Sequence, residues 1–323
     1  MLRVLLLFIL AAGFLCGYVD DELTNLWSSI SDINHPTLND YLLIENYLHT
    51  GTRPYLDLLR EKESLVDANT KRRLKNMLNF KLLGPNQEAP IFELHHLNPT
   101  EKTSKRCILL YASFNGVYEQ KVRRVLDELK RCGYSGDVLL RIGGFPNVEY
   151  GGLKICHVPY SFKVAFLQEA KNRGYKEVLW IDTCMHPICD LESIFSKIEK
   201  VGYFFTYAGK LRENETNNLI EAAIALGISN MDYDVIYHAH SSVLGLNMDN
   251  PKGQALLEEW YQETARVLPN VTWFPEELSL SVVAWRLALK PHAWFGSIVC
   301  GDREIEWLAP LRPTLQFYCD DKR

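Results

Sequence analysis

Short apolar runs alternate with amphipathic segments along the chain from about residue 107 onward. Runs of this length between turn residues indicate buried strands, which are expected at 107–111, 137–142, 154–158, 178–181, 203–206 and 242–246. Between them, apolar residues recur with the spacing of a helix face, which predicts helices around 122–129, over 162–173, around 191–198, over 250–268 and over 275–289. Strands and helices in alternation predict an α/β domain built on a largely parallel sheet.

The first hundred residues have a different pattern, with Leu-rich apolar spacing of a helical kind from about residue 23 to residue 83. A stretch with turn residues, 84–100, then leads like a linker into the α/β region. The chain is therefore divided into a helical stem or accessory region over 20–99 and an α/β domain over 100–323.

The N-terminus combines a positive charge at Arg3 with an apolar run over 4–17, ahead of the first acids at Asp20 and Asp21. This arrangement is typical of a secretory signal, assigned to residues 1–19. The run is shorter than the roughly 20 residues of a membrane span. A cleaved signal peptide, a signal-anchor that crosses the membrane once, a lipid-attached N-terminus and a buried helix all remain open. We expect a secreted or membrane-anchored protein of the secretory pathway, in the Golgi or ER lumen of a eukaryote or in a bacterial cell envelope.

The composition narrows the class of protein. Of the 323 residues, 47% are hydrophobic and 23% are charged, which is ordinary for a folded globular chain. The formal charge is −5 and there is no basic block, which argues against a nucleic-acid partner. The eight cysteines form no C-x-x-C pair, so a structural zinc site is not expected. A Cys184–Cys189 bridge and free core thiols both fit their spacing.

A single acid, Asp182, directly follows the apolar run 178–181. In parallel sheets, ligands gather at the carboxyl ends of the strands. A carboxylate in that place can hold a ribose hydroxyl or a divalent ion that bridges a diphosphate. The alternative is a loop acid that caps a helix or forms a salt bridge.

Five segments together resemble the GT-A glycosyltransferases, which use nucleotide-sugar donors. They are the acid-bearing strand with the following D-L-x-x-I-F segment (178–195), the loop after the first strand (111–115), the helix that begins near Lys163 (159–175), the later strand and helix (242–261), and the acidic stretch at 276–279. The resemblance covers about 107–302 and implies a Rossmann-type mixed sheet flanked by helices. It also implies a set of donor contacts, namely Tyr111, Ser113, Asn115, Lys163 and Asp182.

One position departs from the family pattern. Metal-dependent members carry a second acid two residues after the first, and Cys184 stands there instead. The resemblance implies Mn²⁺ or Mg²⁺, held by Asp182 with a late histidine, which corresponds to His292. Without a metal, the donor diphosphate needs a cationic side chain, and Lys163 or Arg141 can supply it. A plain loop role for His292 and a solvated surface role for both cations are the alternatives.

Two adjacent acids, Glu276 and Glu277, follow an aromatic stretch at 273–275 of the kind that stacks on sugar faces. An inverting transfer needs a group that takes the proton of the acceptor hydroxyl, and these two acids are the catalytic candidates. Acids in the first turn of a helix also favour the helix dipole, which is the alternative. His238 and His240 alternate as on a strand and share one face, either at the acceptor cleft or packed at a strand edge.

The sequence therefore predicts a hexosyltransferase-type enzyme that moves a sugar from a nucleotide-sugar donor to a glycan, protein or lipid acceptor. The alternative is a non-catalytic domain of the same fold that binds carbohydrate or a protein partner, which Cys184 favours. An exported hydrolase with another α/β fold is disfavoured, because the chain contains no G-x-S-x-G and no H-E-x-x-H motif.

Overall fold

The computed structural model describes residues 90–97, 105–113, 116–147, 150, 155, 158–214, 224, 226–266, 275–301 and 315–319. The predicted leader at 1–19, nearly all of the predicted helical stem, Asn115 and most of the predicted strand at 154–158 lie outside these residues. In the described ranges, no helix is both long enough and apolar enough to cross a membrane.

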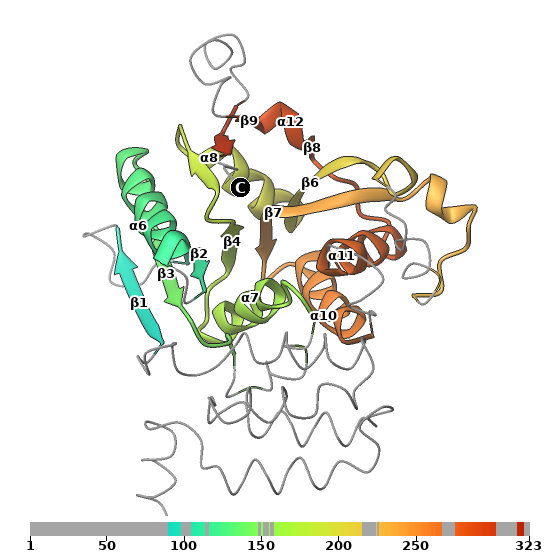
Figure 1. Ribbon diagram of the computed structural model, residues 1–323, viewed down its shortest axis with the longest axis horizontal. Helices are drawn as coiled ribbons and strands as arrows, with labels where there is room; N and C mark the ends of the chain where they lie inside the picture. Colours follow the sequence, from blue (N-terminus) through green and yellow to red (C-terminus); the bar gives the residue numbers. More distant parts are fainter. Residues whose placement is uncertain are drawn as a thin grey trace, which may run out of the picture.

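A mixed sheet of seven strands forms the centre of the α/β domain, in the order β1-β3-β2-β4-β7-β6-β8 (Figure 1). Its strands are β1 (Ile91–His96), β2 (Arg106–Ala112), β3 (Asp137–Ile142), β4 (Glu177–Ile181), β6 (Tyr203–Lys210), β7 (Tyr237–Asn247) and β8 (Ala293–Trp294). Strand β2 pairs in parallel with β3 and β4, and β6 pairs in parallel with β8. The pairs β1–β3, β4–β7 and β6–β7 are antiparallel. The α/β fold with a mixed sheet is confirmed, whereas a largely parallel sheet is wrong, because an apolar run records burial and not strand direction.

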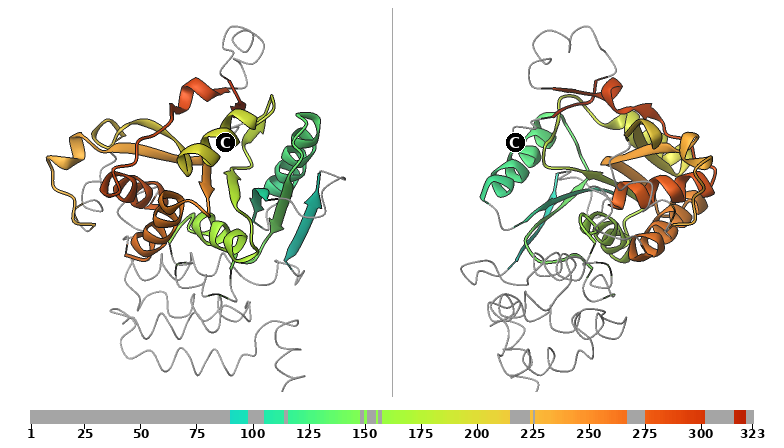
Figure 2. Two further views of the ribbon diagram at one scale, coloured as in Figure 1. Left: turned by 180° about the vertical axis from the view of Figure 1, so that it is seen from behind. Right: turned by 45° about the vertical axis from the view of Figure 1, so that its right-hand side comes forward.

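Helices cover both faces of this sheet (Figures 1 and 2). One face carries α7 (Phe162–Asn172), α10 (Pro251–Arg266) and α11 (Pro275–Arg286), and the other carries α6 (Gly116–Arg131) and α8 (Glu192–Val201). A single short turn, α12 (Phe295–Ile298), follows β8. The predicted helix that begins at Pro275 ends at Arg286, before the left-handed backbone of Ala288, whose φ is 53°.

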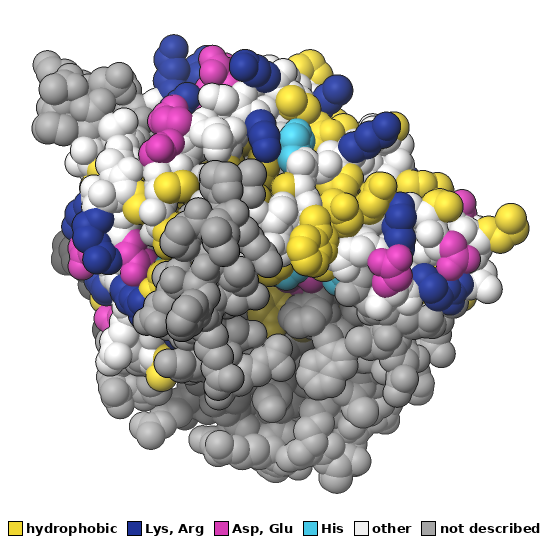
Figure 3. Space-filling view, turned by 90° about the horizontal axis from the view of Figure 1, so that it is seen from above, with side chains coloured by type: hydrophobic (Ala, Val, Ile, Leu, Met, Phe, Trp, Pro, Cys, Tyr) yellow, Lys and Arg dark blue, Asp and Glu magenta, His cyan; other side chains and the backbone are white. Residues whose placement is uncertain are grey.

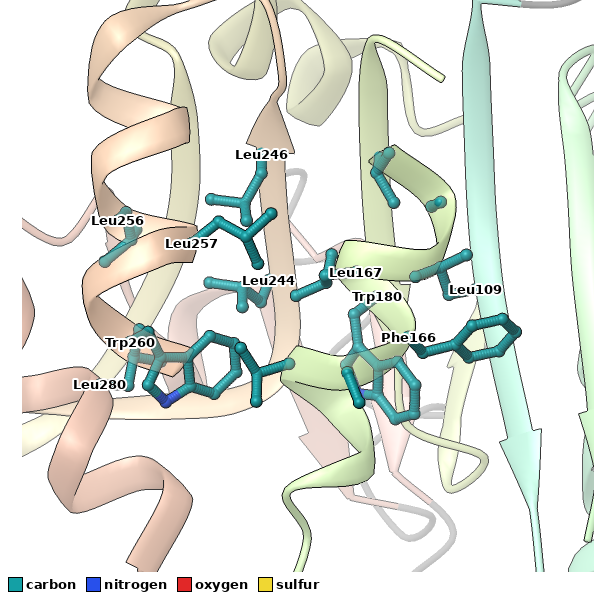
Figure 4. Close-up of a cluster of buried hydrophobic side chains, with 14 of the residues drawn as sticks. Leu109, Phe166, Leu167, Trp180, Leu244, Leu246, Leu256, Leu257, Trp260 and Leu280 are labelled. Atoms are coloured by element: carbon teal, nitrogen blue, oxygen red, sulfur yellow. The ribbon is translucent and has the colours of Figure 1, made fainter. Parts of the chain in front are cut away.

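The strands of the sheet centre are buried on both faces. In β2, Cys107, Leu109 and Tyr111 enter the cluster under α7 and α10, while Ile108 and Leu110 enter the cluster under α6 and α8. Burial on both sides explains why this strand is a continuous apolar run rather than an alternating one. The cluster under α7, α10 and α11 is drawn in Figure 4, in which the two large indole rings of Trp180 and Trp260 lie within it.

Two features were missed by the sequence pattern. Strand β1 lies inside the segment interpreted as a linker, and its residues are only half-buried or exposed because it forms the edge of the sheet. A second sheet of three strands contains β5 (Met185–Pro187), β10 (Phe317–Cys319) and β9 (Val299–Gly301). The amide of Met185 donates to the carbonyl of Asp182 at 2.8 Å, so this small sheet begins directly beside the predicted site.

Candidate active site

Asp182 stands at the end of β4, as the sequence predicts, and three groups fix its position. Its amide donates to the carbonyl of Ser242 in β7 at 2.9 Å. Its carboxylate accepts hydrogen bonds from Trp180 Nε1 at Oδ1 (2.7 Å) and from Lys163 Nζ at Oδ2 (3.1 Å). The side chain is 22% exposed, so this bonded carboxylate still reaches the surface of the protein.

Lys163 lies in the first turn of α7, and its ammonium is buried among acids. Nζ donates to Ser241 Oγ at 2.8 Å and lies 3.5 Å from Glu276 Oε1, in addition to the bond with Asp182. Burial lowers the pKa of Lys163, but the charges of Asp182, Glu276 and Glu277 outweigh it and hold that pKa above its ordinary value. The side chain is therefore a permanent buried cation.

Glu276 and Glu277 open α11 and are both buried beside the same hydroxyl. Glu277 Oε1 accepts from the Ser241 amide at 2.8 Å, and Ser241 Oγ lies 3.1 Å from this oxygen and 3.2 Å from Glu276 Oε1. The turn that carries the two acids is anchored by Trp260, whose Nε1 donates to the carbonyl of Glu276 at 3.0 Å. Two acids assigned from sequence alone thus meet Lys163 and Asp182, which come from other elements.

The two adjacent acids have opposite protonation behaviour. Burial raises the pKa of Glu276 to about 8, against the attraction of Lys163, and Glu277 adds to the rise. Burial also acts to raise the pKa of Glu277, but His240, His238 and Lys163 reverse this and hold it well below the usual carboxyl range. Near neutral pH the pair is one uncharged carboxylic acid beside one carboxylate, the arrangement by which proteins separate acid and base roles.

His238 and His240 flank the ionised acid on one face of β7. His238 Nε2 lies 3.4 Å from Glu277 Oε2, and His240 Nδ1 lies 3.6 Å from Glu277 Oε1. The ring of His240 stacks on Phe295 with centroids 3.8 Å apart, and burial lowers its pKa. Both histidines therefore lie beside Glu277. On the face shown in Figure 3, histidine and acidic side chains lie in a hollow among hydrophobic ones.

Three predicted donor contacts have different surroundings. Tyr111 is buried, donates its hydroxyl to the carbonyl of Gly144 at 2.9 Å and stacks on Phe162 with centroids 4.4 Å apart. Arg141 Nη2 donates to both carboxylate oxygens of Glu169 at 2.9 Å. The Arg141–Glu169 bonds join β3 to the C-terminal half of α7. Tyr111 and Arg141 thus bond to groups other than Lys163 and Asp182. Ser113 is half-buried just after the end of β2.

The described side chains do not fit the predicted metal site. No group of three or more His, Cys, Asp and Glu side chains in these ranges could hold a metal ion. The ring of His292 packs against Tyr203 and Phe204, and burial lowers the pKa of His292 to about 4. These contacts of the His292 ring include no carboxylate of the described residues. The ammonium of Lys163 occupies the side of the Asp182 carboxylate that a cation would take.

The cysteine that replaces the second acid points into the small sheet. Cys184 forms a side-chain hydrogen bond with Cys319 of β10, and this bond together with burial raises the pKa of Cys184 far above its ordinary value. Cys189 is a free thiol whose Sγ contacts Gln316 Oε1 at 3.2 Å. The Cys184–Cys189 bridge is therefore absent from the structure.

Sequence reasoning missed Ser241, which touches Lys163, Glu276 and Glu277. The predicted strand began one residue later, because only the apolar run was counted. The alternation that was noticed at His238 and His240 continues into that run, and extending the strand across it would have placed Ser241 inside β7.

Comparison with solved structures gives low overall similarity. The chain is similar to the galactosyltransferase LgtC in complex with donor and acceptor sugar analogs, with a TM-score of 0.40 and 11% identity over 66% of this chain and 86% of that one. It is similar to mouse xyloside xylosyltransferase 1 in its apo form, with a TM-score of 0.40 and 9% identity over 67% and 98% of the two chains. A glycosyltransferase involved in glycosylation of the major capsid of PBCV-1 gives a TM-score of 0.38 and 10% identity over 67% and 94%. All three proteins are named as glycosyltransferases.

No protein-family model matches the chain, and no curated protein matches it. The candidate site is the cluster formed by Lys163, Asp182, Ser241, Glu276 and Glu277.

Proposed function

We propose that this chain transfers a sugar, of the hexose type, from a nucleotide-sugar donor to a hydroxyl group of a glycan, protein or lipid acceptor. The observation that carries the proposal is the pair of adjacent buried acids at the start of α11, Glu276 and Glu277, which lie 3.2 and 3.1 Å from Ser241 Oγ and beside the ammonium of Lys163. Such a pair supplies a base for the incoming hydroxyl and an uncharged acid beside it. Asp182, at the carboxyl end of β4, supplies a hydroxyl-binding carboxylate next to them.

In the proposed reaction, the acceptor oxygen forms a bond to the anomeric carbon while the bond from that carbon to the donor phosphate breaks. The acceptor proton passes to the Glu277 carboxylate, which His238 and His240 flank at 3.4 and 3.6 Å. The nucleoside diphosphate leaves with the electron pair of the broken bond. Lys163, together with His240 and His238, keeps Glu277 ionised inside the protein.

Mn²⁺ or Mg²⁺ is not assigned a step, because Asp182 is already bonded to an ammonium and an indole. The proposed location is the secretory pathway or the cell envelope, as a secreted or single-pass membrane-anchored protein, on the basis of the leader at 1–19. No nucleic-acid partner is proposed, because the formal charge is −5 without a basic block.

The test is a thermal-shift screen of the full chain with UDP-, GDP- and CMP-sugars, each with and without Mn²⁺. A true donor raises the melting temperature by mass action. The variant Asp182→Ala should lose the shift and keep its fold. The matched control is Asp249→Ala, which breaks a surface ion pair with Lys176 near the start of β4. No shift with any donor, or a shift that survives Asp182→Ala, would contradict the proposal.

A binding domain without turnover is the second candidate, and Cys184 favours it because it stands in place of the family's second acid. Release of nucleoside diphosphate from a donor that binds separates the two candidates. An enzyme releases it faster when acceptor is added, whereas a binding domain releases none above the uncatalysed rate.

A further inference from the structure

Tyr160 has a left-handed backbone with φ of 62°, although it carries a bulky side chain. A non-glycine residue in this region is strained, and such strain persists only where the surrounding structure enforces it. The turn is held by the Ser161 amide on the carbonyl of Val158 (3.3 Å) and by the Lys163 amide on the carbonyl of Tyr160 (3.1 Å). Ser161 Oγ also donates to the carbonyl of Ile155 at 2.7 Å.

The strained turn places the Tyr160 ring near the ammonium of Lys163. Lys163 Nζ lies 5.7 Å from the ring centroid, and the Phe162 ring lies 6.2 Å away at an interplanar angle of 59°. The residue is nevertheless 41% exposed. Burial, followed by the charge of Glu276, raises the pKa of the Tyr160 phenol, with smaller contributions in the same direction from Tyr118 and Asp182. A partly exposed aromatic ring therefore lies beside the buried cation and its acids.

The charge of the cluster selects the kind of group that this ring can hold. Three acids, Asp182, Glu276 and Glu277, surround the single ammonium of Lys163, so acids outnumber cations in the cluster. The net negative charge opposes a phosphate group beside the ring. A pyranose instead presents a C–H face to an aromatic ring and hydroxyl donors to carboxylates, so it fits both surfaces.

We propose that Tyr160 is a sugar-stacking residue, whose ring packs on a neutral hexopyranose while Asp182 accepts hydrogen bonds from its hydroxyls. The inference deepens the proposed function, and it rests on that function where the stacked sugar is the sugar of the donor. The sugar can be that of the donor or the terminal sugar of a glycan acceptor. Both share the same ring chemistry, and the experiment separates them.

The test compares three variants of the full chain. Tyr160→Gly removes the ring and also relieves the left-handed strain, so it should fold with an unchanged or higher melting temperature. Tyr160→Phe keeps the ring. Ala288→Gly relieves the backbone strain of a left-handed residue (φ 53°) just after α11 and removes no ring, so it is the control for the backbone effect alone.

Binding is measured by calorimetry with nucleotide-sugars, the matching nucleoside diphosphates, and methyl hexopyranosides. Tyr160→Gly should lower the affinity for a sugar-bearing ligand about threefold to tenfold, which corresponds to one lost aromatic contact. Tyr160→Phe and Ala288→Gly should retain wild-type affinity. Weaker binding of nucleotide-sugar but not of nucleoside diphosphate assigns the ring to the donor sugar. Weaker binding of methyl hexopyranoside alone assigns it to the acceptor.

Equal weakening of the nucleotide-sugar and the nucleoside diphosphate would overturn the inference, because the ring would then hold the base or phosphates. Unchanged affinity of Tyr160→Gly for every ligand would also overturn it. If wild-type protein binds methyl hexopyranosides and Tyr160→Gly weakens them, but no nucleotide-sugar binds, the proposed function fails and the stacking role stands. If the wild type binds neither nucleotide-sugar nor hexopyranoside, the stacking role fails too.

Discussion

Lys163 Nζ and Asp182 Oδ2 lie 3.1 Å apart, and the lysine side chain is only 5% exposed. This pair joins α7 to the end of β4 and places a fixed positive charge where the sequence motif anticipates a metal ion. The charge belongs to the protein and cannot be removed by a chelator. The cation that the acids need is therefore supplied by the chain itself.

Replacing Lys163 by Met should destabilise the fold by about 3–5 kcal/mol, because the buried Glu277 and the partly exposed Asp182 would lose their shared counter-charge. Urea unfolding at neutral pH measures the change. Lys176→Met is the control, since Lys176 forms a surface ion pair with Asp249 that contributes at most about 1 kcal/mol. Equal losses for the two variants would show that the buried cation has no special role.

The stability of the protein should fall as the pH rises from about 5 to 8. The pKa of Glu276 is raised by burial to about 8, so the stability that its neutral form contributes is complete below the ordinary carboxyl pKa and is lost as the pH passes through 8. Each pH unit in this window lowers the free energy of unfolding by up to about 1.4 kcal/mol. Glu276→Gln keeps a neutral group of the same shape and should flatten the profile. A variant whose unfolding free energy keeps the wild-type slope would contradict this assignment.

Glu277 should act in the opposite direction. Its pKa lies below the usual carboxyl range, so the stability from its ionised form is present above about pH 4.5 and is lost as the pH falls through the lowered pKa. Glu277→Gln should reduce the acid sensitivity measured by circular dichroism. It should also lower kcat by about 10² to 10⁴, the usual contribution of a general base. A variant that turns over at the wild-type rate would remove Glu277 from the proposed chemistry.

Trp180→Phe should lower the affinity for the donor, while its aromatic ring still fills the core. The indole Nε1 donates to Asp182 Oδ1 at 2.7 Å, and loss of a hydrogen bond to a charged group corresponds to about 1.5–3 kcal/mol. We expect a comparable loss in donor affinity, measured by calorimetry. Trp294→Phe, at a residue that is 54% exposed, is the control and should bind donor normally. Normal binding by Trp180→Phe would mean that the orientation of Asp182 does not depend on this bond.

The sequence singled out four side chains that lie together in the structure, and it predicted the sheet incompletely. Asp182 was singled out at the end of an apolar strand, whereas Lys163 and the two acids of α11 came from the resemblance to GT-A glycosyltransferases. The structure brings all four together. Arg141 was assigned to the donor because a metal-free enzyme needs a cation at the diphosphate, yet Glu169 of α7 binds it. The partner of a cation depends on tertiary packing, which spacing along one chain does not report.

The sheet was predicted less completely for a related reason. Strand β1 alternates between exposed and half-buried residues at an edge, so it lacks the continuous apolar run that marked the central strands. The antiparallel pairing of Ile181 with Val243 joins β4 to a strand far along the chain. Nothing in either local pattern encodes that direction, because both strands are simply buried on two faces.

The contact between Lys163 and Ser241 spans 78 residues of sequence, whereas that between Lys163 and Asp182 spans 19. Contacts of long range form late in folding, because the loop that they close is costly in entropy. A chain that has formed α7 and β4 but has not yet docked β7 and α11 therefore has the cation without Ser241, Glu276 and Glu277. The site is a property of the finished domain, and the appearance of ligand binding during refolding would time the docking of β7.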